Sequence, residues 1–413
     1  MNAPLLQSFR LQNFKAVRDS KAIRLTPLTV FIGNNGSGKS SLIEGLEMLQ
    51  HIVDEGLDWA TQQWRGFEHI WNQGTPHKLR SESNERQRFS NPIRFTLRGK
   101  YPNPVGAGTY HFRGSSEVNL AANRDDLFIG NEEVTFRNWF RFTRGESGHT
   151  AAESLMQEKP QLEEYEKLYP LFLRNLGGKA SLTISEQLSD DESLLDEALG
   201  DYISEWQFVS LIPQEMSTPV APQRTGGAVR LAKDGSNLAE YLLNIRKQDL
   251  SAFEGIIETL RYVLPYASDV QPSLTSELER TVYLQLTEQD FKIPGWMMST
   301  GTQRIVALLA LLRNPTPPPL IVIEEIENGL DPRTIHLIVE EIRNAVESGR
   351  TQVIITTHSP YLLDLLSVSQ IVMVERVDGQ PSFTRPADHK DVREWSKTFS
   401  PGKLYTMGKL RQK

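Results

Sequence analysis

The sequence predicts an α/β fold in which a doubly wound sheet carries a phosphate-binding loop, together with an antiparallel β lobe and an inserted, mainly helical segment. Three observations predict it. The glycine-rich run Gly33–Ser40 lies between an apolar, β-branched stretch and a helical pattern. Apolar runs of strand length alternate with helical runs between residues 320 and 375. Short alternating runs separated by turn residues occupy residues 93–142.

Composition limits the classes to which this chain can belong. Its 413 residues, 38% of them hydrophobic, suffice for a large core and for two or three domains. The net charge of −7 gives no overall basic signal for nucleic acid or an anionic membrane, although a local basic patch is compatible with it. With 0 cysteines, disulfides, thiolate metal sites and cysteine nucleophiles are excluded. The sequence has no signal-peptide pattern and no membrane-spanning run, so we expect a soluble, cytoplasmic protein without a membrane partner.

The N-terminal part of the predicted α/β unit, residues 1–75, begins with strands. Gln7–Phe14 alternates apolar and polar residues, and Ala22–Leu25 is a second candidate strand. Leu28–Ile32 is short, apolar and β-branched, as buried strands are. A helical pattern follows the glycine-rich run and continues to Trp71.

The run Gly33–Ser40 fits the pattern G-x-x-x-x-G-K-[ST] of a phosphate-binding loop. Glycines let backbone N–H groups curl around phosphates, and the following helix N-terminus adds positive potential. Lys39 is expected to reach the β and γ phosphates and Ser40 to hold Mg²⁺. A chance match is the alternative, and the flanking strand and helix argue against it. The predicted nucleotide-binding residues are Gly33, Asn34, Asn35, Gly36, Ser37, Gly38, Lys39, Ser40 and Ser41.

Residues 76–230 are predicted to be an insertion that begins with the β lobe. Gly74–Pro92 is polar and is expected to be a solvated loop. Gly130-Asn131 is typical of a hairpin turn. The expected strands are Ile93–Tyr101, Thr109–Phe112 and a pair within Leu127–Phe142.

The rest of the insertion is expected to be mainly helical. Ala151–Leu176 is a charged amphipathic pattern interrupted by Pro160 and Pro170, and Leu194–Ile203 is a second helical pattern. Neither pattern sustains heptads, which argues against a long coiled coil.

The C-terminal part, residues 231–413, alternates helical and strand patterns, as doubly wound sheets do. Asp234 or Ser236 is expected to cap its first helix. The expected helices are Asn237–Ile245, Leu250–Val263, Ile305–Leu312, Thr334–Val346 and Leu362–Leu366. The expected strands are Val282–Leu286, Leu320–Ile323, Val353–Thr356 and Ile371–Glu375.

Acidic and histidine side chains follow two of these buried strands. Because ligands bind beyond the carboxyl ends of parallel strands, Glu324 and Glu325 should face the ligand crevice. Glu324 is expected to hold Mg²⁺ with Ser40, and Glu325 to act as the general base for the attacking water. His358 ends the next strand and is expected to hydrogen-bond the γ phosphate or that water. The alternatives are a solvated helix start for the acids and a loop histidine without a role.

The run Met298–Arg304 leads into an apolar helix. Its Ser299 and Gly301 would suit a second anion-binding helix start. Serine is also a common helix cap, and this run alone favours the cap.

Taken together, these motifs resemble the ATP-binding-cassette (ABC) class of ATPases, in the branch that contains SMC, RecF and OLD-type proteins. The resemblance implies an ABC-type P-loop ATPase head without a long coiled coil. It also implies that Lys39, Glu325 and His358 are catalytic and that Ser299, Gly301 and Asp331 complete the nucleotide site. In chain order the matching runs are the strand ending Asn13-Phe14-Lys15, Walker A at Gly33–Ser40, the signature loop Ser299–Arg304, Walker B at Leu320–Glu325, the D-loop Ile326–Pro332 and the switch histidine in Thr357–Pro360.

Within this branch the chain resembles standalone OLD-like ATPases of the AAA_21 type, which lack a TOPRIM domain. The likeness uses Asp234–Leu238 between the lobes and Gly402–Gly408 near the C-terminus. Two positions depart from the usual pattern. Glu324 replaces the Walker B aspartate but still offers oxygens to Mg²⁺, and Ile326 replaces a proline. The Q-loop glutamine is not placed, with Gln73 and Gln214 as candidates.

The resemblance implies that two heads sandwich ATP, so we expect a homodimer or higher homo-oligomer that uses ATP and Mg²⁺. We expect ATP binding and hydrolysis to regulate a nucleic-acid-directed process, namely phage defence with a separate effector. The segment after the last predicted strand is too short for a TOPRIM nuclease. We therefore expect a separately encoded nuclease or toxin-like effector.

The alternative is a RecF-like ATPase that binds DNA directly in DNA repair. It needs a basic groove, although solvated strand faces are the simpler explanation for the arginines in question. A transporter subunit is disfavoured by the arginine-containing signature loop and the inserted middle, and an SMC-like structural role by the missing coiled coil. The candidate groove residues are Arg86, Arg88, Arg94, Arg98, Lys100 and Arg113.

Overall fold

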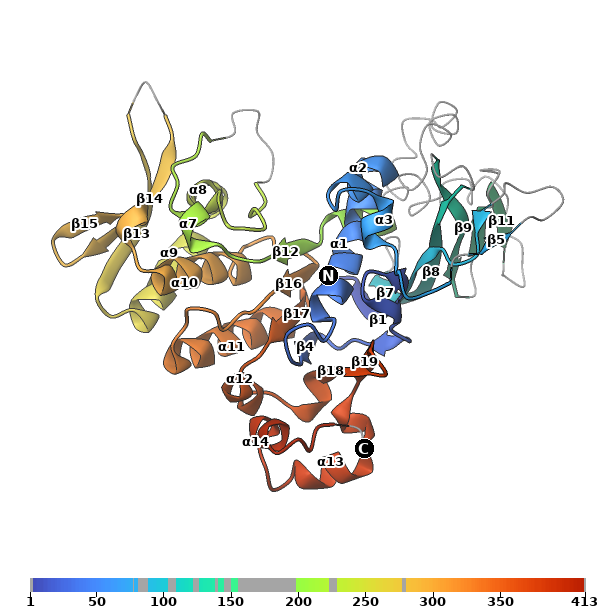
Figure 1. Cartoon of the computed structure of the whole chain (residues 1–413). Coiled ribbons are helices and arrows are strands. Elements are labelled where there is room, and N and C mark those ends of the chain that lie inside the picture. The colour runs from blue at the N-terminus through green and yellow to red at the C-terminus, as the bar shows by residue number, and fades with distance from the viewer. Residues whose placement is uncertain are drawn as a thin grey trace. The chain divides into compact units, whose positions relative to one another are not determined.

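The computed structural model describes residues 3–76, 78–80, 88–102, 109–121, 126–137, 140–144, 150–154, 198–222, 229–276 and 280–411. The chain forms two compact units, each built from several segments, and Figure 1 labels many of their helices and strands. None of the helices in these ranges combines the length and apolar character needed to cross a bilayer. The first unit comprises Met1–Thr26, Gly33–Trp206 and Met373–Thr384, and the second comprises Pro27–Ile32, Gln207–Val372 and Arg385–Lys413.

The first unit contains an eight-stranded antiparallel sheet in the order β11-β10-β9-β8-β7-β1-β2, with β3 also paired to β1. The N-terminal strands and the predicted β lobe therefore form one sheet. Its strands are β1 (Leu5–Phe14), β2 (Val17–Asp19), β3 (Ile23–Arg24), β7 (Ile93–Pro102), β8 (Thr109–Leu120), β9 (Leu127–Phe136), β10 (Phe140–Arg144) and β11 (Thr150–Ser154).

One face of this sheet is apolar because alternate residues of its strands are apolar. Phe9 and Leu11 on β1 are buried opposite Leu97 and Phe95 on β7. Helix α1 packs here through Gly45, where a Cβ atom would lie 2.4 Å from Leu11 Cδ2. Only glycine allows this close approach. The described helices of the unit are α1 (Lys39–Glu55), α2 (Leu57–Gln62), α3 (Phe67–Ile70) and α6 (Ala198–Ser204).

The prediction of a hairpin turn at Gly130-Asn131 is wrong, because both residues lie inside β9. Ser116 on β8 pairs with Glu132, and Val118 pairs with Ile129. Two β9 residues therefore face one residue of β8, which is a β-bulge. Glycine is favoured in bulges as well as in turns, and the local sequence does not distinguish the two.

Two further predictions for this unit need correction. The expected loop Gly74–Pro92 contains two short antiparallel strands, β5 (Leu79–Arg80) and β6 (Arg88–Phe89), where Phe89 is buried. Thr150–Ser154 forms strand β11 and not the start of the helix predicted from Ala151. Most of that helical prediction, residues 155–176, lies outside the described residues. For the second pattern, α6 confirms a helix from residue 198, and residues 194–197 are not described.

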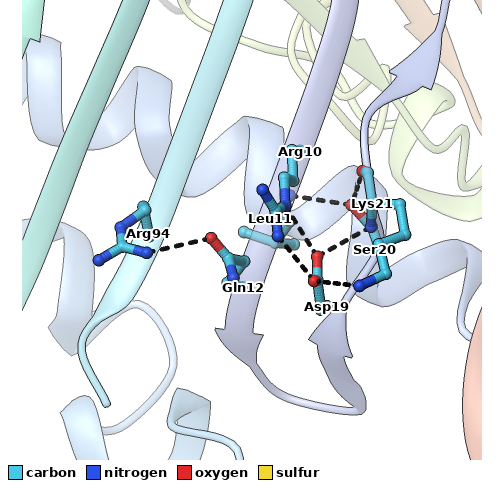
Figure 2. A network of polar contacts seen from close by, with 7 residues as sticks. All are labelled: Arg10, Leu11, Gln12, Asp19, Ser20, Lys21 and Arg94. Carbon is cyan, nitrogen blue, oxygen red and sulfur yellow. Dashed lines mark hydrogen bonds and ion pairs between the residues drawn. The ribbon is translucent and has the colours of Figure 1, made fainter. Parts of the chain in front are cut away.

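An ion-pair network covers the outer face of this sheet at its β1–β2 edge (Figure 2). Asp19 accepts hydrogen bonds from Arg10 Nε and Nη2 at 2.9 and 2.8 Å and from Lys21 Nζ at 2.9 Å. Arg94 on β7 donates to Gln12 Oε1 at 3.4 Å. Burial by itself raises the pKa of Asp19, but the hydrogen bonds from Arg10 and Lys21 and the charge of Arg10 outweigh it. They hold the pKa of Asp19 well below its ordinary value.

Replacing Asp19 with asparagine is expected to lower the free energy of unfolding at pH 7 by about 1 kcal/mol, because the carboxylate is only partly screened by water. A depressed folded-state pKa stabilises the protein above the ordinary value of 3.8 and loses this contribution as the pH falls towards the folded-state pKa. The stability difference from wild type should therefore stay constant between pH 7 and about pH 5 and narrow as the pH falls below about 4, as measured by urea unfolding. A difference that widens on acidification would contradict this assignment.

The second unit is built on four parallel strands in the order β12-β16-β17-β4. All of their residues are buried, as expected for a parallel sheet covered on both faces. Helix α11 (Pro332–Glu347) packs against β4 and β17. The strands are β4 (Leu28–Ile32), β12 (Gln207–Val209), β16 (Leu320–Ile323) and β17 (Gln352–Thr357).

Helices and a small antiparallel sheet complete this unit. The sheet has the order β13-β14-β15, with β13 at Ala267–Leu274, β14 at Val282–Glu288 and β15 at Phe291–Pro294. Neither Asp234 nor Ser236 caps α8, whose N-cap is Asn237. The remaining helices are α7 (Pro213–Met216), α8 (Leu238–Gln248), α9 (Leu250–Val263), α10 (Thr300–Leu312), α12 (Pro360–Asp364), α13 (Lys390–Trp395) and α14 (Pro401–Thr406).

The last hairpin of the chain links the two units covalently. Strand β18 (Ile371–Val377) begins in the second unit and continues into the first, where it pairs antiparallel with β19 (Gln380–Thr384). Parallel strands alternating with helices, plus an antiparallel lobe, confirm the predicted α/β class. The longest described helix, α1, has 17 residues, and no described helix forms a coiled-coil arm.

Candidate functional site

The phosphate-binding loop occupies Gly33–Ser40 at the point where the chain leaves β4 and enters α1. Gly36 and Gly38 have φ angles of 73° and 111°, in the left-handed region that glycine adopts without strain. A Cβ atom on Gly33 would lie 2.1 Å from the carbonyl oxygen of Val374. The three glycines are therefore required by backbone conformation or by packing, as the motif predicts.

Lys39 and Ser37 give this loop its polar interior. Lys39 is only 6% exposed, and its Nζ donates to the carbonyl oxygens of Gly33 at 2.8 Å and Asn34 at 3.1 Å. Ser37 Oγ is buried and has no hydrogen-bond partner among the described residues. Ser40 is exposed in the first turn of α1, which contains no acidic residue. A buried ammonium, a spare hydroxyl and a helix N-terminus fit a phosphate.

The β18–β19 hairpin supports this loop, and the sequence analysis missed it. Arg376 on β18 donates from Nε to the carbonyl oxygen of Gly36 at 2.8 Å and from Nη1 to that of Gly379 at 2.7 Å. Pro381 on β19 fills the space beside Gly38, where a Cβ atom would lie 2.6 Å from its Cγ. The Asp378-Gly379 pair is a hairpin signal in the sequence, but it does not reveal which loop the hairpin meets.

The two acidic residues after β16 are held by neighbouring strands of the second unit. The backbone N–H of Glu324 donates to the carbonyl oxygen of Val209 at 2.9 Å, which continues the pairing with β12. The backbone N–H of Glu325 donates to Thr356 Oγ1 on β17 at 2.9 Å. Glu325 has a φ angle of 47°, so the chain turns sharply here, and its side chain is 50% exposed. The carboxylate of Glu325 is thus placed beyond the strand end and in reach of water.

Glu325 and His358 lie together at the carboxyl ends of adjacent parallel strands. Ile323 at the end of β16 pairs with Ile355, and Thr357 at the end of β17 pairs with Ile32. His358 Nε2 is 3.9 Å from Glu325 Oε1, beyond direct hydrogen-bond distance but within reach of a bridging water. Strand β4 ends at Ile32, so its carboxyl end also lies at this edge of the sheet.

The signature loop is also a helix cap. Ser299 is the N-cap of α10 and its Oγ accepts the N–H of Thr302 at 3.1 Å, so capping and phosphate binding are compatible at this residue. A Cβ atom on Gly301 would lie 2.7 Å from the carbonyl oxygen of Gly329 in the D-loop. Burial lowers the pKa of Arg304, and the charge of Glu325 opposes that shift.

Asp331 has a defined structural role. Its carboxylate caps α11 by accepting the backbone N–H groups of Arg333 at 2.9 Å and Thr334 at 3.2 Å. The hydroxyl of Thr334 also donates to it at 2.5 Å. These hydrogen bonds, that of the hydroxyl first, lower the pKa of Asp331 although desolvation opposes them. Nucleotide contact by Asp331 stays a prediction.

Two groups of predicted residues are brought together within single units. The first group is the phosphate-binding loop, which belongs to the first unit. The second group belongs to the second unit, where Glu325 lies beside His358 and Gly301 lies beside the D-loop. The candidates for the Q-loop are not joined to either group by a described contact. Gln73 Nε2 donates to the carbonyl oxygens of Glu68 and Trp71, and Gln214 lies in α7.

Two family models match the chain. One is AAA_21, described as "AAA domain, putative AbiEii toxin, Type IV TA system", which matches residues 108–364. The other is AAA_15, described as "AAA ATPase domain", which matches residues 5–104. The two matched ranges together contain the phosphate-binding loop, Glu325 and His358.

Curated relatives and a solved structure give more distant matches. Pleiotropic drug resistance protein 2 of Nicotiana plumbaginifolia is 26% identical over 41% of this chain and 12% of its own length. Nod factor export ATP-binding protein I of Sinorhizobium fredii (strain NBRC 101917 / NGR234) is 25% identical over 41% of this chain and 48% of its own length. The chain thus aligns with less than half of either protein. An SMC head, solved in complex with the C-winged helix domain of ScpA, has a TM-score of 0.50 and 13% identity, covering 92% of this chain and 97% of that one. This likeness supports the fold alone.

Proposed function

Because the chain belongs to the AAA_21 family and is an ABC-class ATPase of the SMC/RecF/OLD type, we propose that it hydrolyses Mg-ATP and that ATP-dependent dimerisation controls a separate effector. One observation carries the hydrolytic part of the proposal. Glu325 and His358 lie 3.9 Å apart at the carboxyl ends of two parallel strands, beside the strand that leads into the phosphate-binding loop. In open α/β sheets this edge is where ligands bind.

The proposed roles follow from the position of each group. Bound Mg-ATP supplies the phosphoanhydride bond that is cleaved and the cation that neutralises developing charge. Lys39 would donate to phosphate oxygens in place of the loop carbonyls that it now contacts. Glu325 would accept a proton from water at a carboxylate oxygen, and His358 would orient that water from Nε2. Ser40 and Glu324 would each offer an oxygen ligand to the metal ion.

Dimerisation is proposed from the signature loop and from the class to which the chain belongs. Ser299 is the N-cap of α10, and this helix end would bind phosphate and complete the nucleotide site of a second copy. Light scattering with and without Mg-ATP tests this part of the proposal. ATP-dependent formation of a dimer or a larger complex supports it. A mass unchanged by saturating Mg-ATP, together with unchanged crosslinking between heads, contradicts it.

The effector is proposed from the family description, which names a toxin and a TA system. A neighbouring gene that encodes a nuclease or toxin-like protein is expected, and the two proteins should co-purify. In a phage challenge, cells that carry both genes should be protected, and removal of either gene should abolish protection. Full protection by this chain alone would contradict the need for a separate effector.

Direct DNA binding is a second candidate function, favoured by a row of arginines on the outer face of the first unit's sheet. Arg98 on β7 is directly opposite Arg113 on β8, and both are exposed. Neither has an ion pair to a carboxylate among the described residues. By contrast, Arg94 in the same face is paired with Glu117. Like charges directly opposite each other destabilise a sheet, and an anionic ligand would remove that cost.

On one side the row crosses β9 and reaches a further arginine on β10. In β9, Thr135 pairs with Arg113 and also with Arg141 of β10, and Lys100 pairs with His111 one row away. Arg141 is balanced in part by Glu133, whose Oε1 lies 3.4 Å from its Nε. Basic groups therefore outnumber acidic ones along this row, as binding to a phosphate backbone requires.

Charge reversal of both exposed arginines, Arg98→Glu with Arg113→Glu, is expected to weaken duplex DNA binding at least tenfold at about 0.1 M salt. The slope of log K against log salt should fall by about 2, one for each lost phosphate contact. A mobility-shift titration at several salt concentrations measures both quantities. The matched control is Lys390→Glu with Arg393→Glu, two exposed residues of α13. Equal losses of DNA affinity in the two double variants would show that binding depends only on the net charge of the protein.

A further inference from the structure

The D-loop, Ile326–Pro332, is folded into consecutive turns that point its side chains at the candidate catalytic pair. The N–H of Asn328 donates to the carbonyl oxygen of Glu325 at 3.0 Å, and that of Leu330 to the carbonyl oxygen of Glu327 at 3.1 Å. Gly329 has a φ angle of 71°, which closes the second turn. The turns bring the side chains of Glu327 and Asn328 to opposite ends of the Glu325–His358 pair.

Glu327 holds the main chain at the switch histidine. Its Oε1 accepts the backbone N–H of His358 at 2.5 Å. Its Oε2 is buried and has no hydrogen-bond partner among the described residues. A buried carboxylate oxygen without a hydrogen-bond partner is unfavourable. A contribution to folding stability therefore does not explain why Glu327 is acidic. A hydrogen bond to an ionised acceptor is about twice as strong as a neutral one, which suits a residue that must fix the backbone before a histidine.

Asn328 holds the other member of the pair. Its Nδ2 donates to Glu325 Oε2 at 2.5 Å, so this oxygen is occupied. The second oxygen, Oε1, is the one that lies 3.9 Å from His358 Nε2. Asn328 thereby leaves one carboxylate oxygen of Glu325 directed towards the histidine and available to a water between them.

We propose that Glu327, assisted by Asn328, is a positioning residue that sets the distance between Glu325 and His358 for hydrolysis. This inference rests on the proposed function and adds a residue to which the motifs assign no role. The D-loop also contacts the signature loop. A Cβ atom on Gly301 would lie 2.7 Å from the carbonyl oxygen of Gly329, so a larger residue at position 301 would clash with the D-loop. A shift of the signature loop on binding a second copy would therefore be passed through the D-loop to both catalytic side chains.

The first test separates positioning from substrate binding. Glu327→Ala is expected to lower kcat for ATP hydrolysis by about tenfold to a hundredfold with KM changed less than threefold, since misplacement by about 1 Å costs that much. Glu327→Gln keeps a carbonyl oxygen for the His358 N–H but loses the charge, so it should recover part of the rate. The control is Glu347→Ala, an exposed residue in α11. The proposal would be overturned if Glu327→Ala kept the wild-type kcat, or if the alanine and glutamine variants lost kcat to the same extent.

The second test does not depend on hydrolysis. Hydrogen exchange of the peptide containing His358, followed by mass spectrometry without nucleotide, should be at least about tenfold faster in Glu327→Ala than in wild type, because its amide loses a charged acceptor. Exchange in α11 should be unchanged, which excludes unfolding of the variant. Unchanged exchange at His358 overturns the proposal. A wild-type protein without ATPase activity would contradict the proposed function, and the exchange measurement would still decide whether Glu327 positions His358.

Discussion

Replacing Lys39 with alanine is expected to weaken Mg-ATP binding at least about a hundredfold, which corresponds to about 2.7 kcal/mol. Lys39 is almost fully buried within the phosphate-binding loop, and its ammonium donates to the carbonyl oxygen of Gly33 at 2.8 Å. Alanine removes a charge-assisted donor to phosphate from a site shielded from water, where such hydrogen bonds are strongest. Titration with a fluorescent ATP analogue in the presence of Mg²⁺ measures the change.

Two further variants keep this prediction interpretable. Lys39 also donates to the carbonyl oxygens of Gly33 and Asn34, so alanine could relax the loop as well as remove the charge. Lys39→Met retains most of the side-chain stem and should lose affinity to a similar extent if the charge is responsible. Lys21→Ala removes an exposed lysine from the same unit and should bind normally. Binding by Lys39→Ala within threefold of wild type would show that the loop is not the nucleotide site.

The sequence was sufficient to predict this loop and the edge at which Glu325 and His358 meet. Both predictions follow from rules that act over a few residues, namely the glycine pattern and the exit of the chain from a buried parallel strand. The antiparallel lobe was predicted as well, because its strands alternate clearly. The Gly130-Asn131 turn was wrong for a local reason, since bulges and turns favour the same residues.

The contacts that hold the site could not be predicted in this way. Arg376 reaches the carbonyl oxygen of Gly36 across 340 positions in the sequence, and nothing in its local pattern indicates that partner. Glu327 follows the two Walker B acids closely in sequence, but its contact with the His358 backbone depends on two turns and on the register of β16 with β17. Motifs name the groups that perform chemistry, whereas tertiary structure determines the residues that position them.

Replacing Glu325 with glutamine is expected to lower kcat for ATP hydrolysis by about a hundredfold to ten-thousandfold while ATP binding is retained. Glutamine has nearly the shape of glutamate, and its carbonyl oxygen can still accept the hydrogen bond from Asn328 that Glu325 Oε2 now accepts. It cannot accept a proton from water at neutral pH, so only the general-base step is removed. Phosphate release under saturating Mg-ATP and a binding titration measure the two effects separately.

The same variant gives the sharpest test of dimerisation, because a protein that binds ATP without cleaving it should accumulate in the engaged state. Light scattering of Glu325→Gln should show a mass increase on addition of Mg-ATP that persists, whereas the increase in wild type should decay as ATP is consumed. Adding Ser299→Arg to this variant places a bulky cation at the N-cap of α10 and should prevent the increase. Glu394→Gln, an exposed change on α13, should behave as wild type. If Glu325→Gln hydrolyses ATP at the wild-type rate, then the carboxylate 3.9 Å from His358 is not the base, and the adjacent Glu324 becomes the residue to replace.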